Sequence, residues 1–212
     1  MNWARLFERA AEFDVEVDAV RDALARRRDA VDSSDDERRQ ESADGNAASG
    51  TKAIDPPTDP SPARIVADAD VLAADVLVGG AARAALENPW RHSFVALVAS
   101  DELLSDAEAT IAAAATTGLA SDWRTVVEEW REPVAHPAGD HPGLASAYRG
   151  GAMHLLSFDE GLTSARAGAA FQGRVPVSVR EPRAFATLFD AESLYAEVVG
   201  GEYPGPDRPP RA

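Results

Sequence analysis

Short apolar runs alternate with longer helix-like stretches from Ala63 onward. The clearest runs lie at residues 64–67, 93–98, 154–158 and 175–179. Parallel strands need a long crossover connection, usually a helix, so this alternation is typical of parallel β-α units. The sequence therefore predicts an α/β fold: a three-layer α/β/α sandwich around a central, mostly parallel sheet.

The segment before this domain has a helical period of its own. Over residues 2–30, apolar side chains recur at spacings of three and four, with charged residues between them. This period predicts an amphipathic helix within residues 1–31, and its apolar face must be buried. Docking on the α/β domain and association with a second copy or a partner protein both remain open. The face comprises Trp3, Leu6, Ala10, Phe13, Val17, Val20 and Leu24.

Two further segments have the composition of poorly structured chain. Residues 32–62 are rich in Ser, Asp, Glu, Gly and Pro, with Ile54 as the single large aliphatic residue. Such a segment buries too little apolar surface to offset its ordering entropy, which predicts a disordered linker. The Pro-rich residues 201–212 predict a flexible tail. The α/β domain is thus expected to occupy residues 63–200.

The charge and residue usage exclude several classes of protein. Among 212 residues, 36 are Asp or Glu and 21 are Lys or Arg, which gives a formal net charge of −15. A broad cationic surface for nucleic acid or anionic lipid is therefore not expected. Cysteine is absent, which rules out disulfides, thiolate zinc sites and a cysteine nucleophile. Apolar runs are too short for a membrane span and the first residues do not resemble a signal peptide, so we expect a cytoplasmic protein.

Lys52 is the only lysine, whereas arginine, alanine and aspartate are abundant. Carboxylate-rich surfaces keep a protein hydrated and soluble when concentrated salt screens its charges. The composition therefore looks like that of a halophilic, salt-adapted cytosolic protein, with an ordinary acidic protein as the alternative.

Carboxylates are expected to meet at one edge of the predicted sheet. Ligands of parallel α/β sheets bind at the carboxyl ends of the strands, and acidic residues follow two strands here or lie in adjoining helices. Carboxylates held together repel one another unless a cation neutralises them, and oxygen ligands select Mg²⁺ or Mn²⁺. If these residues converge they form a divalent-metal site, although an Asp before a helix is also an ordinary N-cap. The residues are Asp68, Asp70, Asp106, Asp140 and Asp159.

The same residues carry a resemblance to the PIN-domain family. Residues 65–70 (IVADAD) resemble its opening motif, an apolar strand that ends at an Asp. Ser100, followed six residues later by Asp106, resembles the second motif. Asp140 before an Ala-containing helix resembles the third, and residues 157–159 (SFD) after a strand resemble the fourth.

The resemblance continues to the end of the predicted domain. Residues 175–179 and 182–185 look like the last strand and helix of a PIN domain, so the likeness spans about residues 64–190. The chain resembles uncharacterised PIN-like proteins of salt-loving archaea. Two positions depart from the pattern: Asp106 stands where Glu is usual, and Phe158 stands where a small residue is common.

The resemblance implies a PIN-like fold and a nuclease that hydrolyses RNA with Mg²⁺ or Mn²⁺. Such a metal site activates water, so no side-chain nucleophile is needed. RNA is then the expected partner. By position, the catalytic and metal-binding acids would be Asp68, Asp106, Asp140 and Asp159, and the supporting polar residues Asp70 and Ser157.

Other functions remain open at this point. The main alternative is a PIN-like module without catalysis that serves assembly or RNA binding through its N-terminal helix. Asp68 and Asp70 also resemble the nucleophile and general acid of haloacid-dehalogenase-type phosphohydrolases, but these enzymes typically place a lysine downstream, whereas Lys52 lies upstream. His136 and His141 raise zinc as a ligand, yet their spacing across prolines favours turn or surface histidines.

Overall fold

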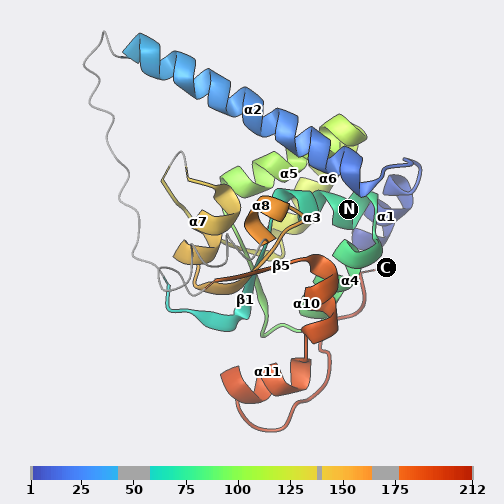
Figure 1. Cartoon of the computed structure of the whole chain (residues 1–212). Helices are drawn as coiled ribbons and strands as arrows, with labels where there is room; N and C mark the ends of the chain where they lie inside the picture. The colour runs from blue at the N-terminus through green and yellow to red at the C-terminus, as the bar shows by residue number, and fades with distance from the viewer. Residues whose placement is uncertain (1, 43–57, 138–139, 164–176, 212) are drawn as a thin grey trace.

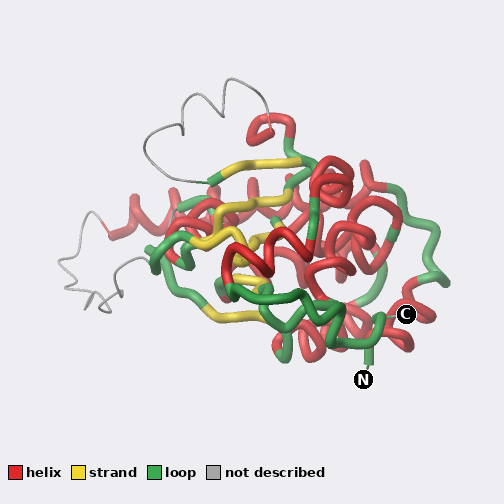
Figure 2. Tube along the Cα trace, turned by 90° about the horizontal axis from the view of Figure 1, so that it is seen from below, coloured by secondary structure: helices red, strands yellow, loops and turns green. Residues whose placement is uncertain are grey.

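The computed structural model describes residues 2–42, 58–137, 140–163 and 177–211. Its sheet has five strands, all parallel, in the order β3-β2-β1-β4-β5, and helices flank it (Figure 1, Figure 2). The predicted α/β class is therefore confirmed. The strands are β1 (Ser61–Ala67), β2 (Ala96–Ala99), β3 (Arg131–Pro133), β4 (Ala152–Leu156) and β5 (Ser178–Arg180). The described helices are α1 (Trp3–Ala10), α2 (Val17–Ser42), α3 (Ala69–Leu77), α4 (Gly80–Trp90), α5 (Asp101–Ala114), α6 (Thr117–Glu128), α7 (Pro142–Arg149), α8 (Glu160–Thr163), α10 (Pro182–Leu188) and α11 (Ala191–Val198).

The strand order reverses direction at β1. From β1 the chain adds β2 and β3 on one side, and it then crosses back to place β4 and β5 on the other side. Ile65 of β1 is in register with Leu97 of β2, and Ala67 of β1 with Leu156 of β4. Ligand sites of parallel sheets lie at the carboxyl ends of the strands where the order reverses. The loops after β1 and β4 are therefore the first place to look for chemistry.

The N-terminal segment forms two helices, so the prediction of one helix over residues 2–30 is wrong. Helix α1 ends at Ala10, and α2 begins at Val17. The β-branched residues Val15 and Val17 have low helix propensity, which favours a break here. The apolar face is buried against the α/β domain, in the same core cluster as β1 and α3. Phe13 and Val17 of that face are half-buried. Its buried members are Trp3, Leu6, Ala10, Val20 and Leu24, and Phe7 is buried beside them.

Helix α3 packs against both N-terminal helices, which makes them part of the structure of the domain. All of its residues, Ala69 to Leu77, are buried, and it contacts α1, α2, α4 and α5. A helix that is buried on every side occupies an inner position and needs neighbours all round. Helices α1 and α2 therefore supply part of the cover that α3 requires.

Helix α2 extends into the region predicted as a linker, as its length in Figure 1 shows. It continues to Ser42, beyond the predicted linker start at residue 32, because the segment contains good helix formers such as Glu, Arg and Gln. Residues 43–57 of the predicted linker lie outside the described residues. None of the described helices, α2 included, is both long enough and apolar enough to cross a membrane.

Two elements, α4 and β3, are absent from the prediction, and β5 differs in its start. Helix α4 has no counterpart among the predicted elements; Gly79 and Gly80 adopt positive φ, 75° and 52°, and turn the chain directly from α3 into this helix. The edge strand β3 was missed because its sequence, Arg-Glu-Pro, has no apolar signal. Strand β5 begins at Ser178, and residues 175 and 176 of its predicted range are not described.

The C-terminal segment is packed, which corrects the prediction of a flexible tail at 201–212. Trp90 donates from Nε1 to the carbonyl oxygen of Pro209 at 2.9 Å, and the Ser93 amide donates to Asp207 Oδ1 at 2.8 Å. Arg211 is buried and donates to both carboxylate oxygens of Asp75, at 2.7 and 3.0 Å. Composition alone could not predict this, because it does not show that Arg211 neutralises a buried carboxylate far away in the chain.

Candidate functional site

The carboxyl ends of β1 and β4 bring three of the predicted polar residues together. Asp68 follows β1, is fully buried and caps α3 by accepting a hydrogen bond from the Ala69 amide at 2.9 Å. Asp70 lies in the first turn of α3 and is 2% exposed, and Ser157 follows β4 and is fully buried. The Asp68 amide donates to the carbonyl oxygen of Leu156 at 2.8 Å, which fixes the two strand ends to each other.

Ser157 lies between the two aspartates. Its Oγ is 3.4 Å from Asp68 Oδ2 and 3.3 Å from Asp70 Oδ2, so its single proton can serve only one of them at a time. The Phe158 amide donates to Asp70 Oδ2 at 2.9 Å. The other oxygen, Asp70 Oδ1, is buried and has no hydrogen-bond partner among the described residues. One carboxylate oxygen at this edge is therefore left to interact with something else.

Burial perturbs the acids of this site. Burial, with the charge of Asp68 as the second cause, raises the pKa of Asp70 from 3.8 to about 7. Burial also raises the pKa of Asp106, although Arg28 and Arg27 oppose the shift. Two neighbouring carboxylates in a desolvated site favour an added proton or an added cation.

Helix α2 brings two arginines into the site that the sequence reading missed. Arg28 Nη2 lies 2.9 Å from Asp68 Oδ1, and Arg28 Nε lies 3.9 Å from Asp106 Oδ2. Arg27 Nε lies 3.5 Å from Asp106 Oδ1. The sequence does contain a signal for this placement: Arg28 follows the buried Leu24 by four residues and so shares its face.

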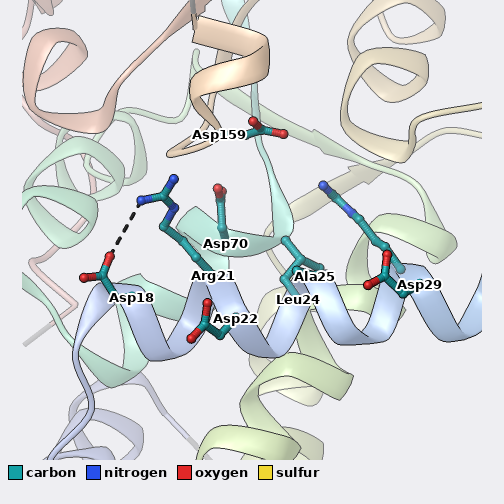
Figure 3. Close-up of a pocket in the computed structure, with 9 residues that line it drawn as sticks. Asp18, Arg21, Asp22, Leu24, Ala25, Asp29, Asp70 and Asp159 are labelled. Atoms are coloured by element: carbon teal, nitrogen blue, oxygen red, sulfur yellow. Dashed lines mark ion pairs between the residues drawn. The ribbon is translucent and has the colours of Figure 1, made fainter.

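A cavity of about 690 Å³ lies between α2 and this edge of the sheet (Figure 3). Asp159, in the loop after β4, is half-buried and lines the cavity with Asp70, while α2 supplies the facing residues. Asp159 Oδ1 accepts a hydrogen bond from the Gly161 amide at 2.7 Å. The lining carries five carboxylates and two guanidinium groups, so it is acidic: Asp18, Arg21, Asp22, Leu24, Ala25, Arg28, Asp29, Asp70 and Asp159.

Asp140 is exposed in the loop before α7, and the neighbouring His141 takes the position that was expected of it. His141 caps α7 by accepting from the Leu144 amide at 3.4 Å. Its Nε2 lies 3.9 Å from Asp68 Oδ2 and is buried without a hydrogen-bond partner in the described chain. Burial lowers the pKa of His141, with the charge of Asp68 opposing, so the ring is neutral at pH 7. The structure thus brings His141, and not Asp140, next to Asp68.

The other histidine raised as a zinc ligand has a packing role. His136 is buried, and its Nε2 lies 3.0 Å from Ser100 Oγ and its Nδ1 2.9 Å from the carbonyl oxygen of Pro137. In the part of the chain that the structure describes, no group of three or more His, Cys, Asp or Glu side chains is arranged to hold a metal ion. Arg28 lies between Asp68 and Asp106, and Asp70 and Asp159 line one cavity. Asp140, exposed in its loop, is not among these neighbours.

Comparison with known proteins identifies one family. The model of a family of unknown function (DUF7384) matches residues 59–211, which run from just before β1 to Arg211. The match leaves out α1 and α2. No curated protein and no solved structure matches the chain.

Proposed function

We propose that this chain, which belongs to the DUF7384 family of unknown function, is a metal-dependent nuclease that hydrolyses RNA at the acidic edge of its sheet. The observation that supports the proposal most directly is Asp70 Oδ1, a buried carboxylate oxygen without a partner among the described residues. It lies beside Asp68, at the strand ends where the sheet order reverses. The resemblance to PIN domains supplies the reaction class.

The donor chemistry at this edge, with the unpartnered Asp70 Oδ1, suits a hard divalent cation once Arg28 no longer stands between Asp68 and Asp106. Carboxylate oxygens are the ligands that Mg²⁺ and Mn²⁺ prefer, and the raised pKa of Asp70 reflects a buried acid pair with too little positive charge nearby. The residues that would hold the ion are Asp68, Asp70, Asp106 and Asp159, with the exposed Asp140 as the further member that the resemblance implies. A bound Mg²⁺ or Mn²⁺ supplies positive charge that activates water and offsets the charge developing on phosphate.

The chain's own residues prepare this site. Ser157 and the Phe158 amide hold Asp70 in place through its Oδ2, which leaves Oδ1 free. Nδ1 of His141 accepts from the Leu144 amide, so the neutral ring carries its proton on Nε2, the nitrogen that lies 3.9 Å from Asp68 Oδ2. The cavity is within the volume range of small-molecule sites. Its carboxylates repel the phosphates of RNA, so RNA would enter only when bound cations offset this negative charge.

The test measures cleavage of fluorescently labelled RNA by the purified chain in Mn²⁺. We expect Asp68→Asn and Asp159→Asn each to lower the cleavage rate by at least about 100-fold, a loss typical of removing a charge-stabilising group. Asp18→Asn, an exposed change on the cavity wall, is the matched control and should keep the parent rate. Circular dichroism checks that each variant is folded. Equal rates in the parent and in both site variants would refute the nuclease.

A module without catalysis is the second candidate, and one observation favours it. Arg28 already neutralises Asp68, so the site as it stands has a counter-charge. Calorimetric titration with Mn²⁺ separates the two functions. Binding that Asp68→Asn abolishes favours the nuclease, whereas absence of binding, together with absence of cleavage, favours the module.

A further inference from the structure

Arg28 occupies the position between two carboxylates that the proposed function assigns to a metal. Its guanidinium reaches Asp68 at 2.9 Å and Asp106 at 3.9 Å. Asp68 is fully buried and Asp106 nearly so, while the arginine side chain is 25% exposed. Arg28 Nε is buried and has no hydrogen-bond partner in the described part of the chain. The guanidinium is therefore a counter-ion with incomplete hydrogen bonding, unlike a fully satisfied buried ion pair.

The helix that carries Arg28 reaches the site from outside the family domain. Helix α2 lies N-terminal to the matched residues 59–211. Val20 and Leu24, each four residues from the next, anchor its first half in the core, and Arg28 continues the same face. In this chain the acidic edge therefore lies within the matched residues, and the helix that neutralises it lies outside them.

The remaining charges of α2 at this edge oppose its docking or contribute little. Asp18, Asp22 and Asp29 line the cavity that Asp70 and Asp159 also line, so like charges face one another across it. Exposed ion pairs such as the contact between Arg21 Nη1 and Asp18 Oδ1, at 3.6 Å, are weak in water. The electrostatic attraction of this part of α2 for the sheet edge is thus concentrated in Arg28, with Arg27 as its neighbour.

We propose that α2 is an intramolecular inhibitor: Arg28 is a tethered cation that competes with the divalent metal for Asp68 and Asp106. This inference rests on the proposed function and adds its regulation. A ligand that binds only when Arg28 has left the site has its apparent affinity reduced by the fraction of molecules in that open state. Metal binding and docking of Arg28 are then mutually exclusive, and raising the metal concentration displaces the helix.

The experiment titrates the full chain with Mn²⁺ by calorimetry and compares the parent with Arg28→Ala and Arg21→Ala. Competition predicts that Arg28→Ala lowers the dissociation constant for Mn²⁺ by at least about tenfold. Arg21→Ala also removes a cavity-lining arginine, but one that contacts only exposed acids, so it should stay within about twofold of the parent. RNA cleavage should rise by the same factor at limiting Mn²⁺ and converge with the parent at saturation.

The outcomes separate the inhibitor from the nuclease. Equal dissociation constants for the parent and Arg28→Ala overturn the inhibitor; the nuclease then stands if Asp68→Asn, added to Arg28→Ala, abolishes Mn²⁺ binding. If neither chain binds Mn²⁺, both proposals fall. If Arg28→Ala does not fold, the titration uses Arg28→Gln instead, and amide hydrogen exchange is measured on the parent. Saturating Mg²⁺ should speed amide exchange over residues 20–28, and unchanged protection there overturns the inhibitor.

Discussion

Replacing Asp70 by asparagine tests the electrostatics of the site without any assumption about its function. Asparagine has nearly the same shape and retains an oxygen that can accept from the Phe158 amide, but it cannot ionise. The parent must ionise a buried carboxyl next to Asp68 whenever the pH exceeds the pKa of Asp70. Asp70→Asn removes that cost, so we expect it to stabilise the protein at high pH.

The size of the effect follows from the pKa of Asp70, which is 3.8 in the ordinary state and about 7 in the folded chain. Between these values the folded protein keeps a proton that the unfolded chain releases, so the free energy of unfolding falls as the pH rises from about 4 to about 7. At 1.36 kcal/mol per pKa unit the full loss is about 4 kcal/mol, and more than half of it falls between pH 5 and pH 8. Above pH 8 the loss is complete and no longer changes.

The assay is urea unfolding, followed by tryptophan fluorescence in metal-free buffer at pH 5, 6, 7 and 8. The stability of Asp70→Asn relative to the parent should increase by about 2–3 kcal/mol over this range. Asp18→Asn, an exposed change at the same cavity, should show a difference below about 0.5 kcal/mol at every pH. If the difference between Asp70→Asn and the parent is the same at pH 5 and pH 8, the reasoning is refuted.

Two further predictions concern contacts that hold the chain together. Arg211→Ala leaves Asp75 buried without its bidentate partner and should lower the free energy of unfolding by about 3–5 kcal/mol, measured by urea unfolding; a loss below about 1 kcal/mol would contradict the buried ion pair. Gly151→Ala should destabilise by more than about 1 kcal/mol, because φ is 64° and a Cβ would collide with the carbonyl oxygens of Asp59 and Thr58. In its control, Gly118→Ala within α6, the added Cβ meets only Arg9 Nη2 at 3.9 Å, an ordinary contact, so the change should be neutral or stabilising by up to about 1 kcal/mol. Similar changes in stability for the two variants would argue against the close approach at Gly151.

The sequence predicts most reliably those helices and strands that have a clear local pattern of apolar and capping residues. Strands β1 and β4 are the short apolar runs that the sequence predicts, and α5 begins at Ser100, whose side chain accepts from the Leu103 amide at 3.1 Å. Edge strand β3 has no such pattern, and the two N-terminal helices share one period although the chain breaks between them. Local signals give the elements, whereas long-range pairs such as Arg211 with Asp75 depend on how the elements meet.

The residues of the candidate site also divide into those that local sequence patterns predict and those that depend on how distant elements pack. Asp68, Asp70 and Ser157 converge because they sit at the ends of neighbouring parallel strands, which the rule for ligand sites in such sheets anticipates. Arg28 could not be found that way, because it comes from a helix whose docking position the sequence left open. The PIN-like likeness, the metal and the RNA substrate stay predictions that the cleavage and titration experiments address.

The buried pair of Arg211 and Asp75 also bears on how the chain matures during translation. Arg211 lies 136 residues after Asp75, and its guanidinium also rests against the ring of Trp3, 4.9 Å from the centroid. A nascent polypeptide emerging from the ribosome would present Asp75 long before Arg211 has been synthesised. The bidentate pair cannot form before residue 211 has emerged, so the packing around Asp75 is completed only after the domain's strands have been synthesised.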